Sequence, residues 1–287
     1  MMKAVIGKAA LTMICAAGLL LGQAAGQAPQ AAPAQSATPV AKQPQVKSQQ
    51  EAQAVMAMFQ APDADARIKA AEELLSKYAD TEFKATALFF EALSYQQKND
   101  FENTIVFAER TLQADPGHYQ SMLTLATTIA MRTREFDLDR EEKLTRAEKS
   151  AKQALELIKT ALKPNPALTD EQWEGAKKDF SSQAYEALGL AALVRKNYDA
   201  AVTELKRSIE TANTPDPTTS IRLGNAYSRA GKYDEAVAVL DKVMADPNAT
   251  PQIKQFAQAE RARAVEAKSG GAKPESPAAP AQAEIKK

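Results

Sequence analysis

Two stretches near the carboxyl end of this chain carry the same pair of residues at a fixed interval. Leu188 and Gly189 in the first stretch correspond to Leu223 and Gly224 in the second, and the offset is 223 − 188 = 35 residues. Self-similarity at such a period indicates a stack of similar structural units. Each unit in such a stack buries its apolar face only against its neighbours, so we expect an elongated repeat fold.

The stretches between turn-forming residues are predicted to be helical. Val202, Leu205 and Ile209 recur at the three- and four-residue spacing of a helix face, and strand-like alternation is absent from the sequence. Proline, glycine, asparagine and aspartate interrupt this pattern at intervals that fit helix ends. We expect helices over 51–60, 64–79, 82–97, 101–114, 119–133, 140–162, 170–195, 198–211, 217–230, 233–245 and 250–267.

Residues 223–248, LGNAYSRAGKYDEAVAVLDKVMADPN, resemble the tetratricopeptide repeat. The resemblance implies an all-α fold, a right-handed α-solenoid of antiparallel helix pairs in which small residues allow close helix contact and aromatic residues fill the space beside them. The residues that carry this packing signature along the chain are Ala92, Tyr95, Phe101, Leu188, Gly189, Tyr198, Ala201, Leu223, Gly224, Tyr227, Gly231, Tyr233, Ala236 and Pro247.

The repeat pattern is broken at two places. Glu91 and Thr104 stand where the first clear unit should have leucine and alanine. Ala126 and Gly189 are 63 residues apart, which is 63 − 34 = 29 more than one period, so this unit is a degenerate, extended repeat. The added stretch contains the only tryptophan, Trp173, for which burial is favoured over a role as an exposed partner anchor. The last helix, over 250–267, is expected to cap the stack.

The ends of the chain have a different character. Residues 1–26 combine Lys3 and Lys8, a short apolar run over 9–22 and small residues after it, which predicts a cleaved secretory signal peptide and a periplasmic or secreted protein. The apolar run is too short for a spanning helix, so no transmembrane helix is expected in the mature chain. Residues 27–50 are rich in proline, alanine and glutamine and are predicted to be a disordered linker, 51–267 to be the helical domain, and 268–287 to be a disordered tail.

The residue inventory argues against catalysis. The chain has 36 basic and 36 acidic residues, one histidine and one cysteine, and Cys15 falls inside the predicted signal peptide. His118 follows a turn and is expected to start a helix, so neither a nucleophile with its base nor a set of metal ligands can be assembled. The acidic stretch from Asp137 to Glu142 lacks the glycine and the distal glutamate of a calcium loop. We expect no enzyme activity, no cofactor, no metal and no nucleic-acid partner.

The resemblance also implies a binding surface, because the concave groove of tetratricopeptide proteins is lined by the first helix of each pair. Most of the matching residues are apolar or neutral, which favours an extended or helical apolar peptide. The alternative is that these side chains pack between repeats. The residues are Phe89, Leu93, Gln96, Leu123, Thr127, Met131, Glu186, Leu190, Leu193, Ile221, Asn225 and Arg229.

Three functions follow in order of preference. The first is an exported adaptor or scaffold that binds a protein or peptide segment. The second is a structural component of bacterial envelope or outer-membrane assembly. The third, an enzyme, is disfavoured by the missing side chains.

Overall fold

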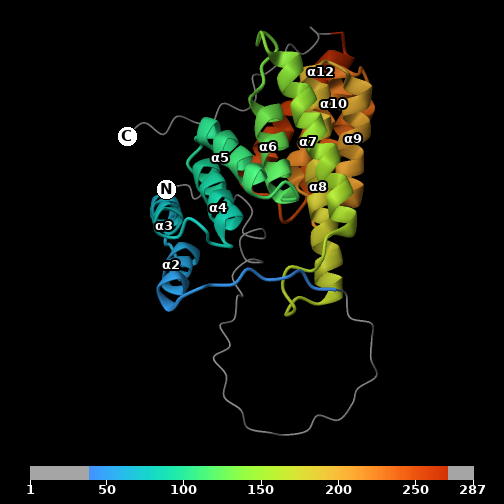
Figure 1. The fold of residues 1–287 in the computed structure, drawn as a ribbon. Coiled ribbons are helices and arrows are strands. Elements are labelled where there is room, and N and C mark those ends of the chain that lie inside the picture. The colour runs from blue at the N-terminus through green and yellow to red at the C-terminus, as the bar shows by residue number, and fades with distance from the viewer. Residues whose placement is uncertain (1–38, 271–287) are drawn as a thin grey trace, which may run out of the picture. The chain divides into compact units, whose positions relative to one another are not determined.

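The computed structural model describes residues 39–270. Within that range the chain forms eleven helices, and its only β-type pairing is a single parallel bridge between Val40 and Lys163. The predicted signal peptide, most of the predicted linker and the tail beyond residue 270 lie outside the described residues. The helices are α2 (Gln49–Phe59), α3 (Ala64–Lys77), α4 (Lys84–Gln97), α5 (Phe101–Ala114), α6 (Tyr119–Arg132), α7 (Arg140–Thr160), α8 (Asp170–Val194), α9 (Tyr198–Thr211), α10 (Pro217–Arg229), α11 (Tyr233–Ala245) and α12 (Pro251–Lys268) (Figure 1).

Every observed helix lies within two residues of its predicted range at both ends. Short polar side chains explain this agreement, since they accept hydrogen bonds from the free N–H groups of the first helical turn. Asp63 caps α3, Asp100 caps α5 and Asn197 caps α9 in this way. At α8, Thr169 Oγ1 accepts from the Gln172 N–H at 3.1 Å, and Gln172 Oε1 accepts from the Thr169 N–H at 2.9 Å, a complete capping box.

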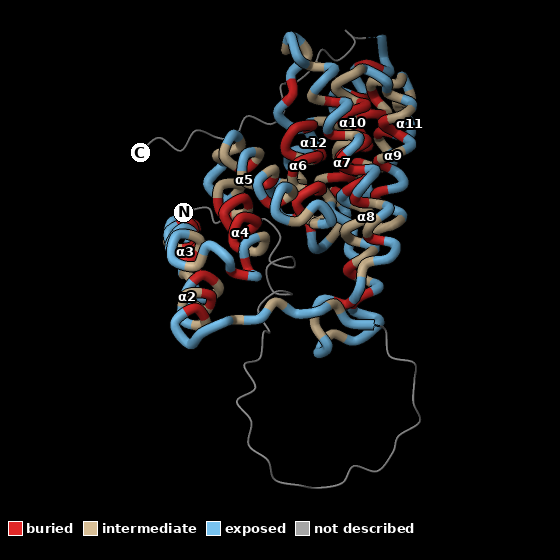
Figure 2. Tube along the Cα trace, viewed as in Figure 1, coloured by how far each residue is buried: buried red, intermediate tan, exposed pale blue. Residues whose placement is uncertain are grey.

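The chain divides into two compact units, which are described separately. Within the described residues, unit 1 comprises 39–116 and 160–176, and unit 2 comprises 117–159 and 177–270. In both units the buried residues recur along each helix on the sides turned toward neighbouring helices (Figure 2). The core of unit 1 is built by α2, α3 and α4, including Met58, Leu74 and Phe90.

The start of the described chain corrects the predicted linker. Residues 39–48 belong to unit 1, where the Ala41 N–H donates to the Lys163 carbonyl at 2.9 Å and the Lys163 N–H donates to the Pro39 carbonyl at 3.2 Å. The Gln45 N–H donates to Glu82, and Ser48 caps α2. Composition suggested disorder because this segment has little to bury, but its main chain obtains partners from a distant loop. The prediction of disorder over 27–50 is therefore wrong for residues 39–50.

The turn between the two helices of a pair has the same geometry at three places. Asn99, Lys196 and Gly231 each adopt a positive φ, between 61° and 76°. One residue later, the backbone N–H donates back to the preceding helix, from Asp100 to Tyr95, from Asn197 to Ala192 and from Lys232 to Tyr227. This left-handed residue with its paired hydrogen bonds is a Schellman-type helix end.

We expect the substitution Gly231→Ala to lower the free energy of unfolding by about 1 kcal/mol, because a side chain makes the left-handed conformation unfavourable. No atom outside the immediate chain lies within 4 Å of a Cβ placed at Gly231, so the change isolates this backbone effect. Gly231→Asn is the matched control, since Asn99 adopts the same conformation, and its loss should be smaller. Urea denaturation of the three proteins measures the difference, and equal stability of all three would contradict the assignment.

Two glycines in unit 2 allow the closest helix contacts. A Cβ built at Gly189 of α8 would lie 2.7 Å from Leu205 Cγ on α9, and one built at Gly224 of α10 would lie 2.7 Å from Leu240 Cγ on α11. In both pairs the leucine follows the glycine by 16 residues. The same step from Ala92 of α4 leads to Ala108 of α5, and both of these alanines are fully buried. In this pair the first helix has alanine in place of glycine, and the second helix has alanine in place of the larger leucine.

Candidate functional site

Three polar residues of the predicted groove in unit 2, Glu186, Asn225 and Arg229, pair with one another or with neighbouring helices. Glu186 of α8 accepts a hydrogen bond from Thr219 at 2.7 Å and forms an ion pair with Arg222. On α10, Asn225 donates to Glu260 of α12 at 2.9 Å and accepts from Arg229 at 2.8 Å. These contacts link α8, α10 and α12, so the groups are occupied in joining helices.

The apolar residues of the predicted groove divide between core and surface. Phe89 is 5% exposed and Leu123 is 2% exposed, so neither offers a partner much side-chain surface. Met131, by contrast, is exposed. The remaining members are half-buried, and they are Leu93, Gln96, Thr127, Leu190, Leu193 and Ile221. A binding role for this face remains a prediction.

Unit 1 contains a groove that the sequence did not predict. It is an open depression of about 580 Å³ between α3, α4 and α5. Leu75 of α3, Leu88 of α4 and Phe107 of α5 supply its large apolar side chains. The complete lining is Glu72, Leu75, Ser76, Ala79, Lys84, Leu88, Glu91, Phe107, Arg110, Gln113 and Ala114.

Glu91 is the unusual residue of this groove. It is 1% exposed, and its Oε2 atom accepts no hydrogen bond from any residue in the described part of the chain. The equivalent positions in unit 2 are Leu188 and Leu223, which are buried, and Leu223 packs in an apolar cluster with Leu205. Glu91 is thus a carboxylate at a position that elsewhere in the chain belongs to the core. A buried polar group without a partner is costly, so its presence calls for an explanation.

The surroundings of Glu91 change its acidity. Burial raises the pKa of the Glu91 carboxyl from 4.5 to about 7, and the nearby charge of Glu72 contributes to the rise. Arg110 acts in the opposite direction. Near neutral pH the groove therefore contains a carboxyl that exists in both protonation states.

Aromatic contacts support the wall of the groove on α5. The rings of Phe107 and Tyr95 are stacked, with centroids 5.1 Å apart and an angle of 22° between their planes. The guanidinium of Arg110 also lies over the Phe107 ring, 5.1 Å from its centroid. These contacts hold Phe107 in place beside the open space.

The two residues singled out for possible chemistry or binding have structural roles. His118 caps α6, where its Nδ1 atom accepts from the Ser121 N–H at 3.2 Å. Trp173 is fully buried in unit 1, and its indole N–H donates to the Ala161 carbonyl at 3.3 Å. The predicted burial of Trp173 is therefore confirmed, and the alternative of an exposed partner anchor is wrong.

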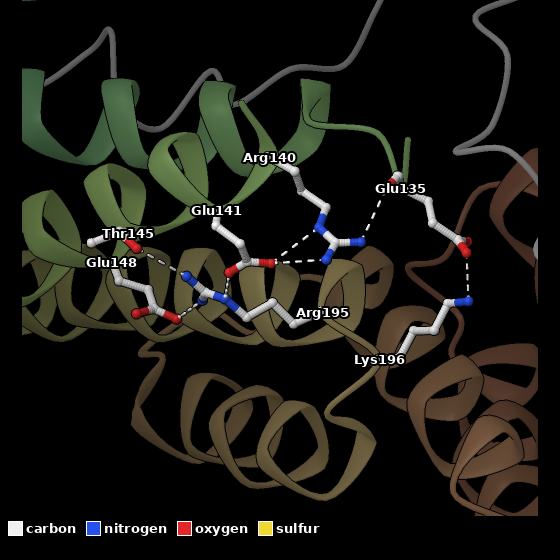
Figure 3. A network of polar contacts seen from close by, with 7 residues as sticks. All are labelled: Glu135, Arg140, Glu141, Thr145, Glu148, Arg195 and Lys196. Atoms are coloured by element: carbon white, nitrogen blue, oxygen red, sulfur yellow. Dashed lines mark hydrogen bonds and ion pairs between the residues drawn. The ribbon is translucent and has the colours of Figure 1, made fainter. Parts of the chain in front are cut away.

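A polar network in unit 2 surrounds the loop between α6 and α7 (Figure 3). Arg195, the residue after α8, donates to Glu141 at 2.8 Å and pairs with Glu148, while Arg140 donates to Glu141 and to the carbonyl of Glu135. Lys196 also pairs with Glu135.

Between these anchors the α6–α7 loop presents Phe136, which is 88% exposed, and the fully exposed Leu138. The loop is fixed by its charged residues while its apolar ones face solvent. It is a second surface with residues suited to a protein contact, although isolated exposed apolar residues are also common on protein surfaces.

Within residues 39–270, the side chains of histidine, aspartate and glutamate form no group of three or more that could hold a metal ion. No helix in the same range combines the length and the apolar character required to cross a membrane.

Comparison with known proteins places this arrangement in context. Residues 218–246, which span α10 and α11, match the tetratricopeptide repeat family. The crystal structure of TTC0263, a thermophilic tetratricopeptide-repeat protein of Thermus thermophilus, is similar over 73% of this chain and 98% of that chain, with 17% identity and a TM-score of 0.52. This similarity confirms the predicted all-α helical-repeat fold.

Two further similarities are weaker. The crystal structure of MamA protein matches 64% of this chain and 87% of its own, with 21% identity and a TM-score of 0.41. The assembly chaperone of RpL4, Acl4, matches 76% of this chain and 96% of its own, with 12% identity and a TM-score of 0.38. No curated protein matches the sequence. One helix pair thus matches the tetratricopeptide repeat, and the described chain has a helical-repeat fold.

Proposed function

We propose that this chain is a non-enzymatic scaffold that binds a segment of another protein, and that the groove between α3, α4 and α5 is its principal binding site. The observation that carries the proposal is the buried Glu91 carboxylate, whose Oε2 atom has no hydrogen-bond partner among the described residues, in the lining of an open groove with apolar side chains. Protein sites for small groups are typically concave and apolar, with a few polar groups that fix orientation. A tetratricopeptide-type fold agrees with such a role, since it is typically a protein-interaction module.

The predicted groove on the first helices is the competing surface. Its members Glu186, Asn225 and Arg229 already make hydrogen bonds or ion pairs within the chain, whereas Glu91 retains an unused acceptor atom. A new hydrogen bond to a buried group that has no partner contributes more binding free energy than a contact with a group that is already hydrogen-bonded. This difference favours the groove in unit 1.

A photo-crosslinking amino acid can separate the two surfaces. Placed at Gln113, on the rim of the unit 1 groove, it should capture a partner protein from an extract of the native cell envelope. Met131, which is exposed on the first-helix surface, is the alternative position, and Ala238, exposed on α11, is the control. Capture from Met131 alone would move the site to the first helices, and equal capture from all three positions would remove any specific site.

We further propose that the protein is exported and acts in the periplasm or outside the cell. The support is the sequence of residues 1–26, with its positive start, apolar run and small residues. Amino-terminal sequencing of the native protein after cell fractionation should find a chain that begins near Gln27. Firm association with membrane fractions would favour the alternative of a structural part in envelope assembly, and an uncleaved chain in the cytoplasm would refute export.

A further inference from the structure

We propose, on the basis of the scaffold function above, that the unit 1 groove recognises a cationic side chain, lysine or arginine, next to an apolar residue of the partner. The geometry that supports this is the burial of the Glu91 carboxylate in the lining of a groove that also contains Leu75, Leu88 and Phe107.

The missing contact of Glu91 determines what the ligand must supply. In its ionised form the Glu91 carboxyl only accepts hydrogen bonds, so in that form Oε2 requires a donor from the ligand. Hydrogen bonds between ionised partners are the strongest of this kind, and they are stronger still away from water. An ammonium or guanidinium group therefore meets the requirement better than a hydroxyl or an amide.

The other charged groups of the groove refine this choice. Glu72 faces Glu91 from α3, Lys84 lies on α4, and Arg110 lies on α5. Glu72 affects Glu91 more strongly than Arg110 does, and Arg110 is in contact with the Phe107 ring. The carboxylates of Glu72 and Glu91 therefore favour a ligand cation in the groove, and the charge of Arg110 opposes it less strongly than the charge of Glu72 supports it.

The apolar walls explain the second half of the proposal. The stems of lysine and arginine are hydrocarbon chains that pack along apolar surface while the charged head reaches a partner. The half-buried Leu75 and Phe107 offer such a surface in the groove that Glu91 lines, whereas Leu88 is buried and contributes little. A ligand with a charge alone would leave these side chains in water, and a purely apolar ligand would leave Oε2 without a donor.

A set of three probes with one hydrocarbon chain tests the recognition directly. Hexylammonium, hexan-1-ol and hexanoate are titrated separately into the full chain and followed by NMR chemical shifts. Hexylammonium should bind in the range of about 1–10 mM, at least about tenfold more tightly than hexanol, and shift the signals of Leu75, Leu88 and Phe107. Hexanoate should not bind. No binding of hexylammonium in this range, equal binding of hexanol, or shifts elsewhere would overturn the proposal.

Two variants make the test specific. Glu91→Gln keeps the shape of the side chain and removes its charge, so affinity for hexylammonium should fall about tenfold or more, which corresponds to about 1.4 kcal/mol. Glu73→Gln is the matched control, because Glu73 is exposed on α3 and does not line the groove. Unchanged affinity in Glu91→Gln would overturn the proposal, as would an equal loss in both variants.

The pH dependence of probe binding has a definite sign. The cation binds the ionised form of Glu91, whose pKa burial raises to about 7 in the empty groove. Affinity should therefore be constant above this pH and fall as the pH drops below it, and Glu91→Gln should abolish the dependence. Rising affinity at low pH would contradict a cationic ligand.

The probe titration tests the cationic ligand class, and the crosslinking experiment tests the scaffold function, so either proposal can be rejected without the other. Capture of a protein at Gln113 without a preference for hexylammonium would leave the scaffold function standing and reject the cationic class. Selective hexylammonium binding without any captured protein would reject the scaffold function while retaining the chemistry of the groove.

Discussion

Replacing Gly224 with leucine is expected to lower the free energy of unfolding by about 2–3 kcal/mol, because α10 and α11 leave no room for a side chain there. A Cβ at this position would lie 2.7 Å from Leu240 Cγ and 2.9 Å from Leu240 Cδ2. The better helix propensity of leucine offsets only about 0.8 kcal/mol of this loss. Thermal and urea denaturation of the variant measure the change, and unchanged stability would show that the helix pair does not pack in this register.

A double-variant cycle distinguishes a steric clash from a general effect of leucine. Leu240→Ala alone should lower stability by about 2–5 kcal/mol, since it leaves a cavity in the core. Combined with Gly224→Leu it should cost less than the sum of the two changes, because the new side chain enters the vacated space. Ala238→Leu, on the exposed side of α11, is the control and should have little effect. Strict additivity would contradict direct contact between positions 224 and 240.

Replacing Glu91 with leucine is expected to raise the free energy of unfolding by about 3 kcal/mol or more at pH 8. The change removes a buried carboxylate that lacks a partner, and it restores the residue type found at Leu188 and Leu223. The same variant should lose hexylammonium binding. Higher stability with lost binding would show that the groove is maintained at the expense of stability, as is common at functional sites.

The pH dependence of this gain follows from the direction of the pKa shift. The pKa of Glu91 is raised from 4.5 to about 7, so the folded protein retains a proton that the unfolded chain releases between these values. The contribution of Glu91 to stability is therefore full below pH 4.5 and is lost as the pH rises through 7, a difference of about 3 kcal/mol. The advantage of Glu91→Leu should grow over this interval. Glu72→Gln, a change on an exposed residue of α3, should leave most of the pH dependence in place.

The sequence was sufficient for the helices and for the contacts within each pair. Helix ends were predictable because Asp63, Asp100 and Asn197 cap their own helices, an interaction between residues close in sequence. The close contacts at Gly189 and Gly224 were predictable because the same residues recur 35 positions apart. Both kinds of information are local or periodic.

The groove in unit 1 could not be predicted in the same way. Its lining comes from three helices, and the missing partner of Glu91 becomes visible only when the residues of α3 and α5 are placed around it. The sequence contained one signal, namely a glutamate where the repeat has leucine. That departure marked an exception to the pattern, but it did not indicate whether the carboxylate would be buried or would face water.

The first-helix surface was harder to predict for a related reason. The repeat pattern placed Glu186 and Asn225 on the correct helices, but the structure shows that Arg222 and Glu260 bind them from neighbouring helices. Residues 39–48 were misjudged because composition measures what a segment can bury and says nothing about the main-chain partners that another loop provides.

The path of the chain limits where it can be shortened. Unit 1 is assembled from 39–116 and from 160–176, so the polypeptide leaves it and returns once. A protein cut off after Pro116 would lose both the Lys163 backbone that pairs with Ala41 and the indole of Trp173. A shortened protein that is meant to keep unit 1 therefore has to retain residues 160–176 as well as 39–116.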